Sequence, residues 1–415
     1  MRIAIIGAGA AGMMAAATIN EQSPDTEVFL IEKNDGLGKK VIISGGGRCN
    51  VTTGITDLKV VTKKYPRGEK FLISSLHRFS PEDVRNWFEA HGVPLKCEDD
   101  LRVFPVSNDG RDVVRAFETI FINSNTKVLK KFAVQAIERN AADSVFVIHI
   151  KDQPDIEADC VVLSLGGQAY RHTGSTGDGY TLAESLGHHI TKLAASLNSF
   201  ITSESWPGTL SGVSFERATI TAEREKKYSF TGPFLFTHRG ISGPAVFAVS
   251  SLIAFEDYNP QNPFPIFIDF LPDIKADNLL AEIKNIIKIN PKKSFKNILH
   301  SYIPRCVIEM LEKEFSLPLE KKSAEVSNKE VQLVMEKLKH LPVHAVGRGA
   351  GDEFVTAGGV TLDEVNPRTL ESLICPNLYF AGEILAIDGF TGGFNLQAAW
   401  ATGRAVGESI VKKIS

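Results

Sequence analysis

The sequence is poor in cysteine, and its few cysteines stand far apart. Cys49, Cys97, Cys160, Cys306 and Cys375 are spread over 415 residues without a Cys-x-x-Cys pair. Isolated cysteines in odd number argue against a disulfide framework and against a zinc site. We therefore expect a protein of the reducing cytoplasm that binds no metal.

No charge of either sign dominates, and no hydrophobic run is long enough to cross a membrane. The chain has 46 lysine and arginine residues against 49 aspartate and glutamate residues, a formal net charge of -3. This balance gives no sign of the basic surface that binds nucleic acids, so we expect neither a nucleic acid nor a membrane as partner. The uncharged stretch from residue 3 to residue 18 resembles a signal peptide, but its glycine spacing indicates a folded motif, and we expect no targeting signal.

Lysines recur at helical spacing in one region, at Lys284, Lys288, Lys292, Lys293 and Lys296. Such a run fits either a nucleic-acid patch or a solvated helix face. The nearly neutral chain favours the solvated face.

The first residues form a short apolar strand that leads directly into a glycine-rich turn. Residues 2–6 are followed by Gly7-Ala-Gly-Ala-Ala-Gly12 and a helix-forming run. In a dinucleotide-binding turn such glycines allow a tight turn, close approach of a pyrophosphate and close helix packing. A second strand ends at Glu32, about 20 residues beyond Gly12, where an acid hydrogen-bonds a ribose and disfavours NADP. The expected FAD or NAD contacts are Gly7, Gly9, Ala10, Ala11, Gly12, Glu32 and Lys33.

The length of the chain, 415 residues, exceeds the roughly 250 to 300 residues at which one hydrophobic core stops growing. Strand-like runs at 127–137, 144–150 and 159–165, with helical patterning at 81–91, indicate a parallel, doubly wound sheet. Residues 34–53 are too rich in glycine for a regular helix or strand. We predict a nucleotide-binding domain in two parts, 1–189 and 346–415, interrupted by a β-rich domain at 190–275 and a helical domain at 276–345.

A second glycine-rich segment, near the C-terminus, indicates which of the two cofactors, FAD or NAD, is bound. Residues 381–404 place Glu383 after an apolar strand and two glycines before a long helix. In glutathione-reductase-type flavoproteins such an acid contacts the ribityl or phosphate region, and the helix start stabilises negative charge at the flavin pyrimidine edge. The alternative is a glycine-rich loop that closes an ordinary sheet; the paired N-terminal motif favours flavin. The expected contacts are Gly382, Glu383, Gly392, Gly393, Asn395 and Leu396.

Five longer strings together resemble one family: Gly38–Asn50, Arg102–Pro105, Thr173–Tyr180, Phe236–Pro244 and Thr356–Val360. They are similar, in order and from end to end, to the BaiN/YhiN-type NAD(P)/FAD-dependent oxidoreductases, also called aminoacetone-oxidase-family flavoproteins. The resemblance implies an α/β fold, with a glutathione-reductase-type, Rossmann-like FAD-binding domain and an inserted β-barrel-like plus small helical domain. One departure is Tyr170-Arg-His172, where the family more often has Tyr-Pro-Lys, so the roles of Arg171 and His172 stay open.

The resemblance also assigns the glycine-dense segment to the flavin. Arg48 would lie near the phosphate or the ring, with Cys49 beside it. Cys49 has no partner cysteine at a disulfide-reductase spacing, which favours packing over redox chemistry. Lys39 and Lys40 are expected on phosphate or ribityl oxygens, although a solvated lysine pair fits as well. The full set of implied contacts adds Ser44, Gly45, Gly46 and Asn50, the backbone of Val134 at the adenine, and Gly166 and Gly167.

Catalytic residues are less clearly marked. Histidine side chains titrate near neutral pH, so His238, within a family-like string, is the candidate acid or base. A structural histidine in a turn fits equally. Arg239 and Arg348 are candidates for binding an anionic or carbonyl group, although a surface arginine often only forms an ion pair.

Together these features predict a cytoplasmic FAD-dependent oxidoreductase, a monomer or dimer. It would transfer a hydride between flavin N5 and a small organic or steroid-like substrate, by enone or imine reduction or by amine oxidation. NAD(P)H is a candidate reductant, although the chain has no second strand-GxGxxG-helix unit. Two other classes stay open: a flavin-dependent RNA-modifying or RNA-bound protein, and a flavin-binding scaffold or sensor with low turnover.

Overall fold

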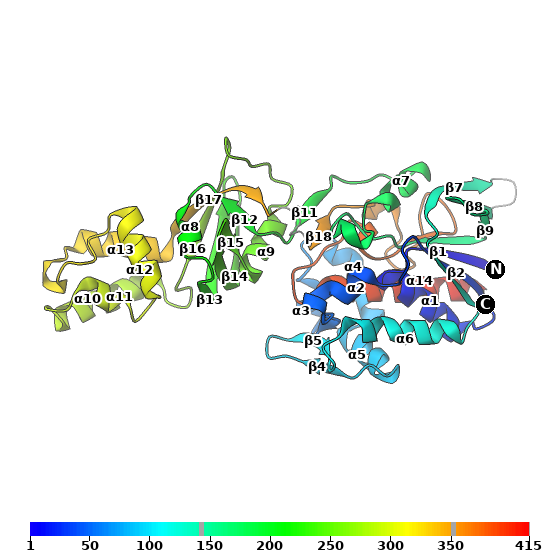
Figure 1. Cartoon of the computed structure of the whole chain (residues 1–415), viewed down its shortest axis with the longest axis horizontal. Helices are drawn as coiled ribbons and strands as arrows, with labels where there is room; N and C mark the ends of the chain where they lie inside the picture. Colours follow the sequence, from blue (N-terminus) through cyan, green and yellow to red (C-terminus); the bar gives the residue numbers. More distant parts are fainter. Residues whose placement is uncertain (141–144, 350–353, 415) are drawn as a thin grey trace. The chain divides into compact units, whose positions relative to one another are not determined.

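The chain folds into two compact units, and the first is built from both ends of the sequence (Figure 1). The computed structural model describes residues 1–140, 145–349 and 354–414. The first unit comprises Met1–Ala195 with Glu353–Ser415, and the second comprises Ser196–Asp352. The second unit is therefore an insertion in the chain of the first.

A five-stranded parallel sheet forms the centre of the first unit. Its strands are β1 (Arg2–Ile6), β2 (Glu27–Glu32), β6 (Thr126–Lys130), β10 (Cys160–Leu163) and β19 (Leu378–Phe380). The spatial order is β19-β10-β1-β2-β6, with parallel pairing throughout. The strands β10 and β19 are buried at every residue, as expected for a parallel sheet covered on both faces. The carboxyl ends of parallel strands meet at one edge, which is where ligands bind in such sheets.

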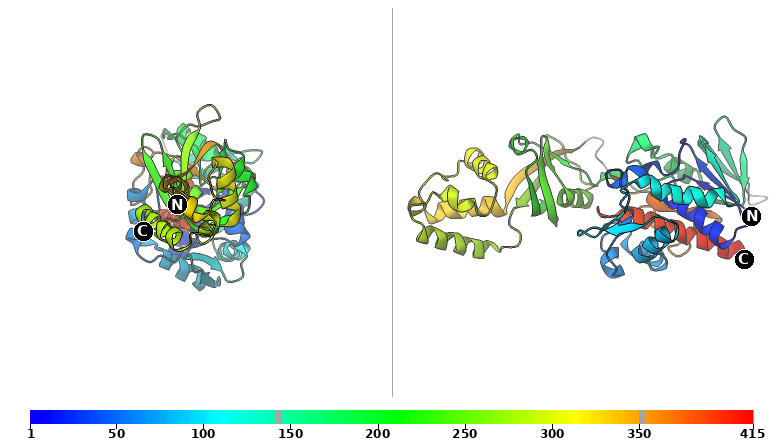
Figure 2. Two further views of the ribbon diagram at one scale, coloured as in Figure 1. Left: turned by 90° about the vertical axis from the view of Figure 1, so that its left-hand side faces the viewer. Right: turned by 60° about the horizontal axis from the view of Figure 1, so that its bottom comes forward.

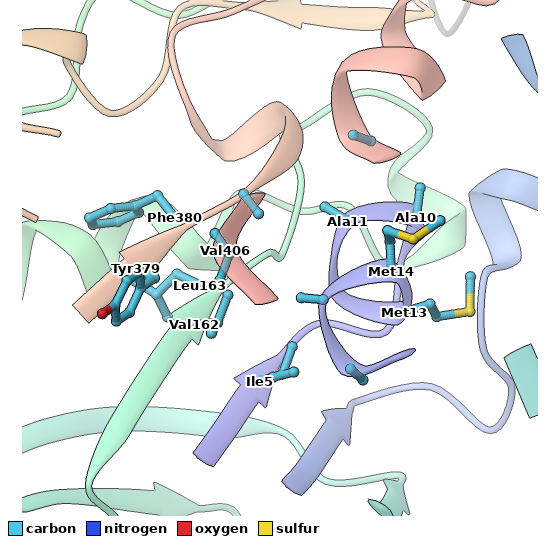
Figure 3. Close-up of a cluster of buried hydrophobic side chains, with 14 of the residues drawn as sticks. Ile5, Ala10, Ala11, Met13, Met14, Val162, Leu163, Tyr379, Phe380 and Val406 are labelled. Carbon is cyan, nitrogen blue, oxygen red and sulfur yellow. The ribbon is translucent and has the colours of Figure 1, made fainter. Parts of the chain in front are cut away.

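Two helices from opposite ends of the chain pack against each other on this sheet. They are α1 (Ala10–Gln22) and α14 (Phe394–Ile414), which Figure 2 shows side by side in blue and red. Figure 3 shows Met14 of α1 and Val406 of α14 in one buried cluster with Leu163 of β10. Since α1 follows β1 and α14 follows β19, the glycine-rich turns before both helices belong to this unit.

Further helices and three small sheets complete the first unit. Helix α5 begins as predicted, because Ser80 and Asp83 form a reciprocal capping box. The strands are β3 (Thr52–Thr53), β4 (Leu95–Cys97) and β5 (Arg102–Pro105) in one sheet, β7 (Val134–Asn140), β8 (Val145–Ile150) and β9 (Ile156–Ala158) in another, and the short β11 (Ala194–Ser196) and β18 (Val355–Ala357) in a third. The helices are α2 (Lys39–Ile43), α3 (Leu58–Thr62), α4 (Glu69–Arg78), α5 (Pro81–Ala90), α6 (Gly110–Ile122) and α7 (Asp178–Ser185).

The second unit contains a closed barrel of six antiparallel strands. Along β16 and most of β17, buried and partly exposed residues alternate, so one face of each strand fills the interior. Strand β17 closes the barrel between β12 and β16, and it crosses the domain boundary predicted at residue 345. In spatial order the strands are β12 (Phe200–Thr202), β15 (Gly240–Ser242), β14 (Lys227–Thr237), β13 (Ser214–Glu223), β16 (Phe264–Asp269) and β17 (Leu341–Arg348).

Helices of the second unit share one hydrophobic core with the barrel. Among the described residues of the whole chain, none of the helices combines the length and apolar character needed to span a membrane. The helices are α8 (Trp206–Thr209), α9 (Pro244–Leu252), α10 (Ala276–Ile289), α11 (Phe295–Leu299), α12 (Arg305–Phe315) and α13 (Asn328–Lys339).

The structure confirms the predicted fold class and corrects two local predictions. The run at 127–137 is not one strand, because Lys131 has φ of 65° and ends β6. Its amide donates to the Asn34 carbonyl at 2.9 Å, and the chain then starts β7 in a different sheet. Within the glycine-dense stretch 34–53, residues 39–43 carry no glycine and form the short helix α2.

Candidate functional site

The turn after β1 requires glycine at two of its three positions for packing. A Cβ atom on Gly7 would lie 2.7 Å from the Ser164 carbonyl oxygen, and one on Gly12 would lie 2.0 Å from the Gly7 carbonyl oxygen. Both distances are far below van der Waals contact, and interiors packed this densely do not yield by such amounts. Close packing of α1 against the sheet therefore explains Gly7 and Gly12.

Gly9 is different, because nothing in the protein excludes a side chain there. It is the N-cap of α1, with φ of -79° and ψ of -168°, and a Cβ atom would meet no atom within 4 Å. No side chain caps α1, so the N–H groups of its first turn are left for another acceptor. A pyrophosphate fits this place, since it needs both the open space and the amides.

Glu32, the buried last residue of β2, reaches the same turn. Its Oε2 accepts a hydrogen bond from the Ala8 amide at 3.0 Å, and its Oε1 accepts from the Asn34 side chain at 2.7 Å. A carboxylate offers about four lone-pair sites, so acceptor capacity is left for a ribose hydroxyl. The Glu32 carbonyl accepts from the Phe132 amide at 3.0 Å, and Val134 starts β7 two residues later. Glu32, the proposed ribose contact, therefore lies next to the segment that carries Val134, the proposed adenine contact.

Two of the candidate lysine contacts are engaged within the protein. Lys33 Nζ lies 2.5 Å from Asp178 Oδ2, and Lys39 Nζ lies 2.8 Å from Asp35 Oδ1. The Lys39 hydrogen bond lowers the pKa of Asp35, yet both side chains are exposed, and such pairs contribute little to stability. Each lysine keeps further donors for a phosphate oxygen, because an ammonium group has three.

Lys40 and Glu383 join the N-terminal loop to the C-terminal segment. Lys40 Nζ lies 2.6 Å from Glu383 Oε2, and Glu383 Oε1 accepts from the Thr356 amide at 2.9 Å. A Cβ atom on Gly167 would lie 2.5 Å from Thr356 Oγ1 and 3.0 Å from Glu383 Oε1. The structure therefore brings together five of the candidate contacts: Lys40, Gly166, Gly167, Gly382 and Glu383.

The segment from Ser44 to Asn50 is a tight coil held by its own backbone. Gly45, Gly46 and Gly47 have φ of 56°, 71° and 88°, a left-handed conformation that favours glycine. The Cys49 amide closes the coil by donating to the Ser44 carbonyl at 2.9 Å. Successive amides in such turns form anion-binding concavities, so this coil is suited to a phosphate or a developing oxyanion.

Arg48 lies beside this coil in a fixed orientation. Its guanidinium carbon is 3.8 Å from the centroid of the Phe104 ring, and its Nη1 is 2.7 Å from Glu98 Oε1. The same ring limits the coil, since a Cβ atom on Gly45 would lie 2.9 Å from Phe104 Cε1. About a third of the Arg48 side chain is exposed, and a guanidinium has five N–H donors, so donors beyond the Glu98 pair are left for a ligand at the edge of the coil.

Cys49 is a buried thiol rather than a reactive one. It is fully buried, and desolvation raises its pKa to about 12. A protonated thiol is a poor nucleophile, which supports a packing role at neutral pH.

Native alkylation is expected to divide the cysteines by burial. Iodoacetamide at about pH 8 should modify the exposed Cys97 and Cys306 and leave Cys49, Cys160 and Cys375 unmodified, because the latter three are buried and burial raises the pKa of each thiol. Peptide mass spectrometry before and after denaturation measures this pattern. Rapid native labelling of Cys49 would contradict the packing role.

The start of α14 is tied to the residues that follow the coil. A Cβ atom on Gly393 would lie 2.3 Å from the Thr52 carbonyl oxygen. The Asn50 side-chain amide donates to that carbonyl at 3.0 Å and accepts from the Gly393 amide at 2.9 Å. Trp400 Nε1 donates to the Val51 carbonyl at 2.9 Å. The two segments assigned to the flavin therefore form one connected structure.

At the first turn of α14, backbone N–H groups rather than side chains are left to bind a cofactor. Asn395 is used locally, since its Oδ1 accepts from the Gly389 amide and its Nδ2 donates to the Gly389 carbonyl, both at 2.8 Å. Leu396 packs partly against the core, and Gly392 precedes the helix with φ of 125°. The first N–H groups of a helix have no acceptor within it, so they are suited to the electron-rich edge of a flavin.

Sequence reasoning missed three side chains that hold this region. Both Asp388 oxygens pair with the Arg67 guanidinium, with Oδ2 2.5 Å from Nη2, although the Asp388 side chain is fully buried. The Tyr65 hydroxyl donates to the Phe394 carbonyl at 2.8 Å, and desolvation raises the Tyr65 pKa. An acid within the apolar run before the C-terminal glycines was the available signal for Asp388.

The three candidate catalytic residues belong to the second unit, whereas every candidate cofactor contact belongs to the first. His238 and Arg239 form the exposed turn between β14 and β15. Arg348, at the end of β17, donates through Nη2 to the Ala254 carbonyl at 2.8 Å and lies 4.7 Å from the Tyr258 ring centroid. These contacts favour a structural role for Arg348.

The first unit thus fits one extended dinucleotide cofactor. Open space and free amides lie at the start of α1, an acid ends β2, a second glycine coil follows α2, and a second helix start closes the group. No three side chains of histidine, cysteine, aspartate or glutamate gather as metal ligands within the part of the chain that the structure describes.

Known proteins share this organisation. The family model for the HI0933-like protein Rossmann domain matches residues 1–409. The 3-dehydro-bile acid delta(4,6)-reductase of Clostridium scindens is 29% identical over 414 residues, with 99% of each chain covered. The ribosomal RNA dihydrouridine synthase of Haemophilus influenzae is 30% identical over 415 residues, with 99% of this chain and 98% of the relative covered. The solved 3-ketosteroid-delta4-(5alpha)-dehydrogenase of Rhodococcus jostii shares the fold, with a TM-score of 0.51, 14% identity, and 99% of this chain and 96% of that chain covered.

The family match spans both units and agrees with the cofactor geometry of the first. Its members are enzymes, which sets aside the flavin-binding scaffold considered from the sequence. The chain belongs to the HI0933-like Rossmann family of BaiN/YhiN-type oxidoreductases, and its cofactor is FAD.

Proposed function

We propose that this protein reduces a carbon–carbon double bond conjugated with a carbonyl group. One observation carries the proposal: two relatives that match the whole chain are named for substrates of that kind. A 3-dehydro bile acid with a delta-4 double bond has a ketone conjugated with that bond. Uridine, the precursor of dihydrouridine, has a ring double bond conjugated with a carbonyl. The conjugated bond is what the two named reactions have in common.

Bound FAD supplies the hydride for such a reduction and is reloaded by a reductant such as NAD(P)H. The protein has to hold the double bond in line, place a positive group at the carbonyl oxygen and deliver one proton to the carbon next to the carbonyl. A positive group is needed because negative charge builds up on the oxygen as the hydride adds. The amides at the start of α14 would serve the cofactor in a similar way, by stabilising negative charge at its pyrimidine edge.

Two residues suit the substrate roles. We assign the carbonyl oxygen to Arg48, because the Phe104 stack and the Glu98 pair fix a guanidinium beside the glycine coil. For the proton we keep His238, the candidate from the sequence, which is exposed in the β14–β15 turn of the second unit.

Uridine within RNA is the second candidate substrate, and the Haemophilus influenzae relative is the observation that favours it. The bond to be reduced is of the same type, so the cofactor site and both assigned residues would serve it unchanged. What differs is docking, since a polymer needs a surface beyond the reacting base. The charge balance of the sequence predicts no nucleic-acid partner, and the experiment that follows tests whether RNA is a substrate.

Anaerobic reoxidation is expected to identify the substrate class. Holoenzyme reduced by NADH or NADPH should regain the visible absorbance of oxidised FAD on mixing with a 4-ene-3-ketosteroid or a uridine-containing RNA. A saturated ketone and an isolated alkene should not restore it, because neither spreads the developing charge onto a carbonyl oxygen. Stopped-flow absorbance gives the rate, and mass spectrometry detects hydrogen added across the double bond. Reduction of FAD by amines, with no reoxidation by any conjugated substrate, would contradict the proposal.

His238→Gln in the same assay tests the proton donor. Loss of a positioned general acid should lower kcat roughly 100-fold while FAD content and spectrum stay unchanged. His77→Gln, at an exposed histidine in α4, is the matched control and should retain full activity. Equal rates for both variants would make His238 structural.

A further inference from the structure

The helical part of the second unit carries a concentrated positive surface. Between Glu282 and Glu309 the chain has five lysines and one arginine and no acid, although the whole chain has a net charge of -3. We use the name lysine tip for five exposed residues of this region and its neighbour in space: Lys284, Lys288, Lys292, Lys293 and Lys322.

The lysine tip lies at the end of the helical part away from the barrel. Helix α10 begins soon after β16 ends, and α13 ends directly before β17 begins, so residues 276 and 339 mark the barrel side. The opposite ends of these helices are Ile289 and Asn328, and 14 residues of α10 span about 21 Å. Figure 1 shows the loop after α10 at this distant end.

Backbone pairing brings the two lysine segments together. Residues Ser294 and Lys322 form an antiparallel bridge, and the Ser323 amide donates to the Lys293 carbonyl at 2.9 Å. The Ala324 amide donates to the Pro291 carbonyl at 3.1 Å. The lysines at 292–293 and at 321–322 therefore lie on adjacent segments of the chain.

Other lysines nearby differ from those of the lysine tip, because they form ion pairs. Lys296 is held between Glu312 and Glu320, at 3.1 and 2.8 Å, and only 15% of its side chain is exposed. Lys321 pairs with Glu330 at 2.5 Å. The lysines of the tip, in contrast, are exposed and form no ion pair with any carboxylate among the described residues. Their charge is available to a partner.

We propose that the lysine tip binds the phosphodiester backbone of RNA. Exposed lysines are flexible point charges that suit phosphate contacts, which position a nucleic acid without reading its sequence. Ile289, 68% exposed between these lysines, adds apolar surface for a ribose or base. Lys284 and Lys288 lie about 12 and 18 Å along α10 from its barrel end, and the loop lysines lie beyond them; a small substrate has no use for cations spread over this distance, whereas a polymer does. The proposal rests on the uridine branch of the proposed function.

The test measures RNA binding directly, with the full-length protein loaded with FAD. Fluorescence anisotropy follows a labelled RNA hairpin with uridines in its loop, at KCl concentrations from about 50 to about 200 mM. The variant Lys292→Gln/Lys293→Gln removes two adjacent charges of the tip. Its Kd is expected to rise roughly tenfold, and the slope of log Kd against log [KCl] is expected to fall by about 1.5, because two fewer phosphates are neutralised.

Lys226→Gln/Lys227→Gln is the matched control, since it removes two adjacent exposed lysines where β13 leads into β14, although Lys227 pairs with Glu223 at 3.4 Å. It should change RNA affinity by less than about twofold. Equal losses in both variants, or no RNA binding by the parent protein, would overturn the proposal. Binding to phosphatidylserine vesicles that depends on the tip, in place of RNA binding, would overturn it as well.

Activity separates this proposal from the proposed function. Both double variants should reduce a small conjugated ketone at the parental rate, because neither pair belongs to the cofactor or substrate residues. A protein that binds RNA through the lysine tip but reduces no conjugated substrate would contradict the proposed function and leave the docking surface in place.

Discussion

Replacing Gly9 by valine is expected to remove FAD from a protein that still folds. The Gly9 backbone, with φ of -79° and ψ of -168°, is open to any L-residue, and its Cβ would meet no protein atom within 4 Å. The added methyl groups would fill the space that a pyrophosphate needs at the start of α1. Overfilling a packed site costs about 1–3 kcal/mol, so FAD affinity should fall roughly 10- to 100-fold. FAD retained after gel filtration and the Kd from FAD titration measure this loss.

Gly12→Ala provides the contrast within the same turn. Its Cβ would lie 2.0 Å from the Gly7 carbonyl oxygen, so α1 has to move away from the sheet. We expect this variant to lose stability even without FAD, whereas the Gly9→Val apoprotein should keep its melting temperature within a few degrees. If Gly9→Val binds FAD normally, the turn after β1 is not the pyrophosphate site.

Local signals made much of the first unit predictable from sequence. Residues 7–12 run from the end of a strand into the first turn of the next helix, and Ser80 caps the helix that follows it. Each of these features depends on residues within one or two turns of backbone. Periodicity and capping rules read such features directly.

Contacts between distant residues were not predictable in the same way. Strand β17 has an alternating pattern, but its place is set by pairing with β12 and β16, and a preceding helical run masked it. The split of residues 127–137 depends on Lys131, whose amide meets the Asn34 carbonyl on another part of the chain. Arg67 and Asp388 are separated by 321 residues, and neither position alone indicates the other.

The lysine run shows how structure changes the meaning of a charge pattern. Spacing placed Lys296 with Lys292 and Lys293 on one solvated face. The structure places Lys296 between two carboxylates and brings Lys322 to the remaining lysines through the bridge to Ser294. Helical spacing could not indicate this, because the two segments meet outside any helix pair, at the isolated bridge between Ser294 and Lys322 and the hydrogen bond from the Ser323 amide to the Lys293 carbonyl.

Replacing Arg67 by methionine is expected to lower the free energy of unfolding by about 3 kcal/mol or more. The Asp388 carboxylate is fully buried, and the Arg67 guanidinium binds both of its oxygens. Removing the guanidinium breaks a buried ion pair to both carboxylate oxygens, which costs about 3–5 kcal/mol, whereas methionine keeps most of the apolar stem. Urea unfolding followed by circular dichroism, on the apoprotein and with saturating FAD, measures the change.

Asp388→Leu in the Arg67→Met background should recover part of the lost stability, because removing both charges leaves none to be buried. Arg115→Met, at an exposed pair with Asp112 in α6, is the matched control and should have little effect. The loop that ends in Asp388 leads into Gly393 and α14, and Tyr65 holds the Phe394 carbonyl close by. The single variant should therefore also weaken FAD binding, and the double variant should restore it only as far as the loop regains its position. Equal destabilisation by Arg67→Met and Arg115→Met would contradict a structural role for the buried pair.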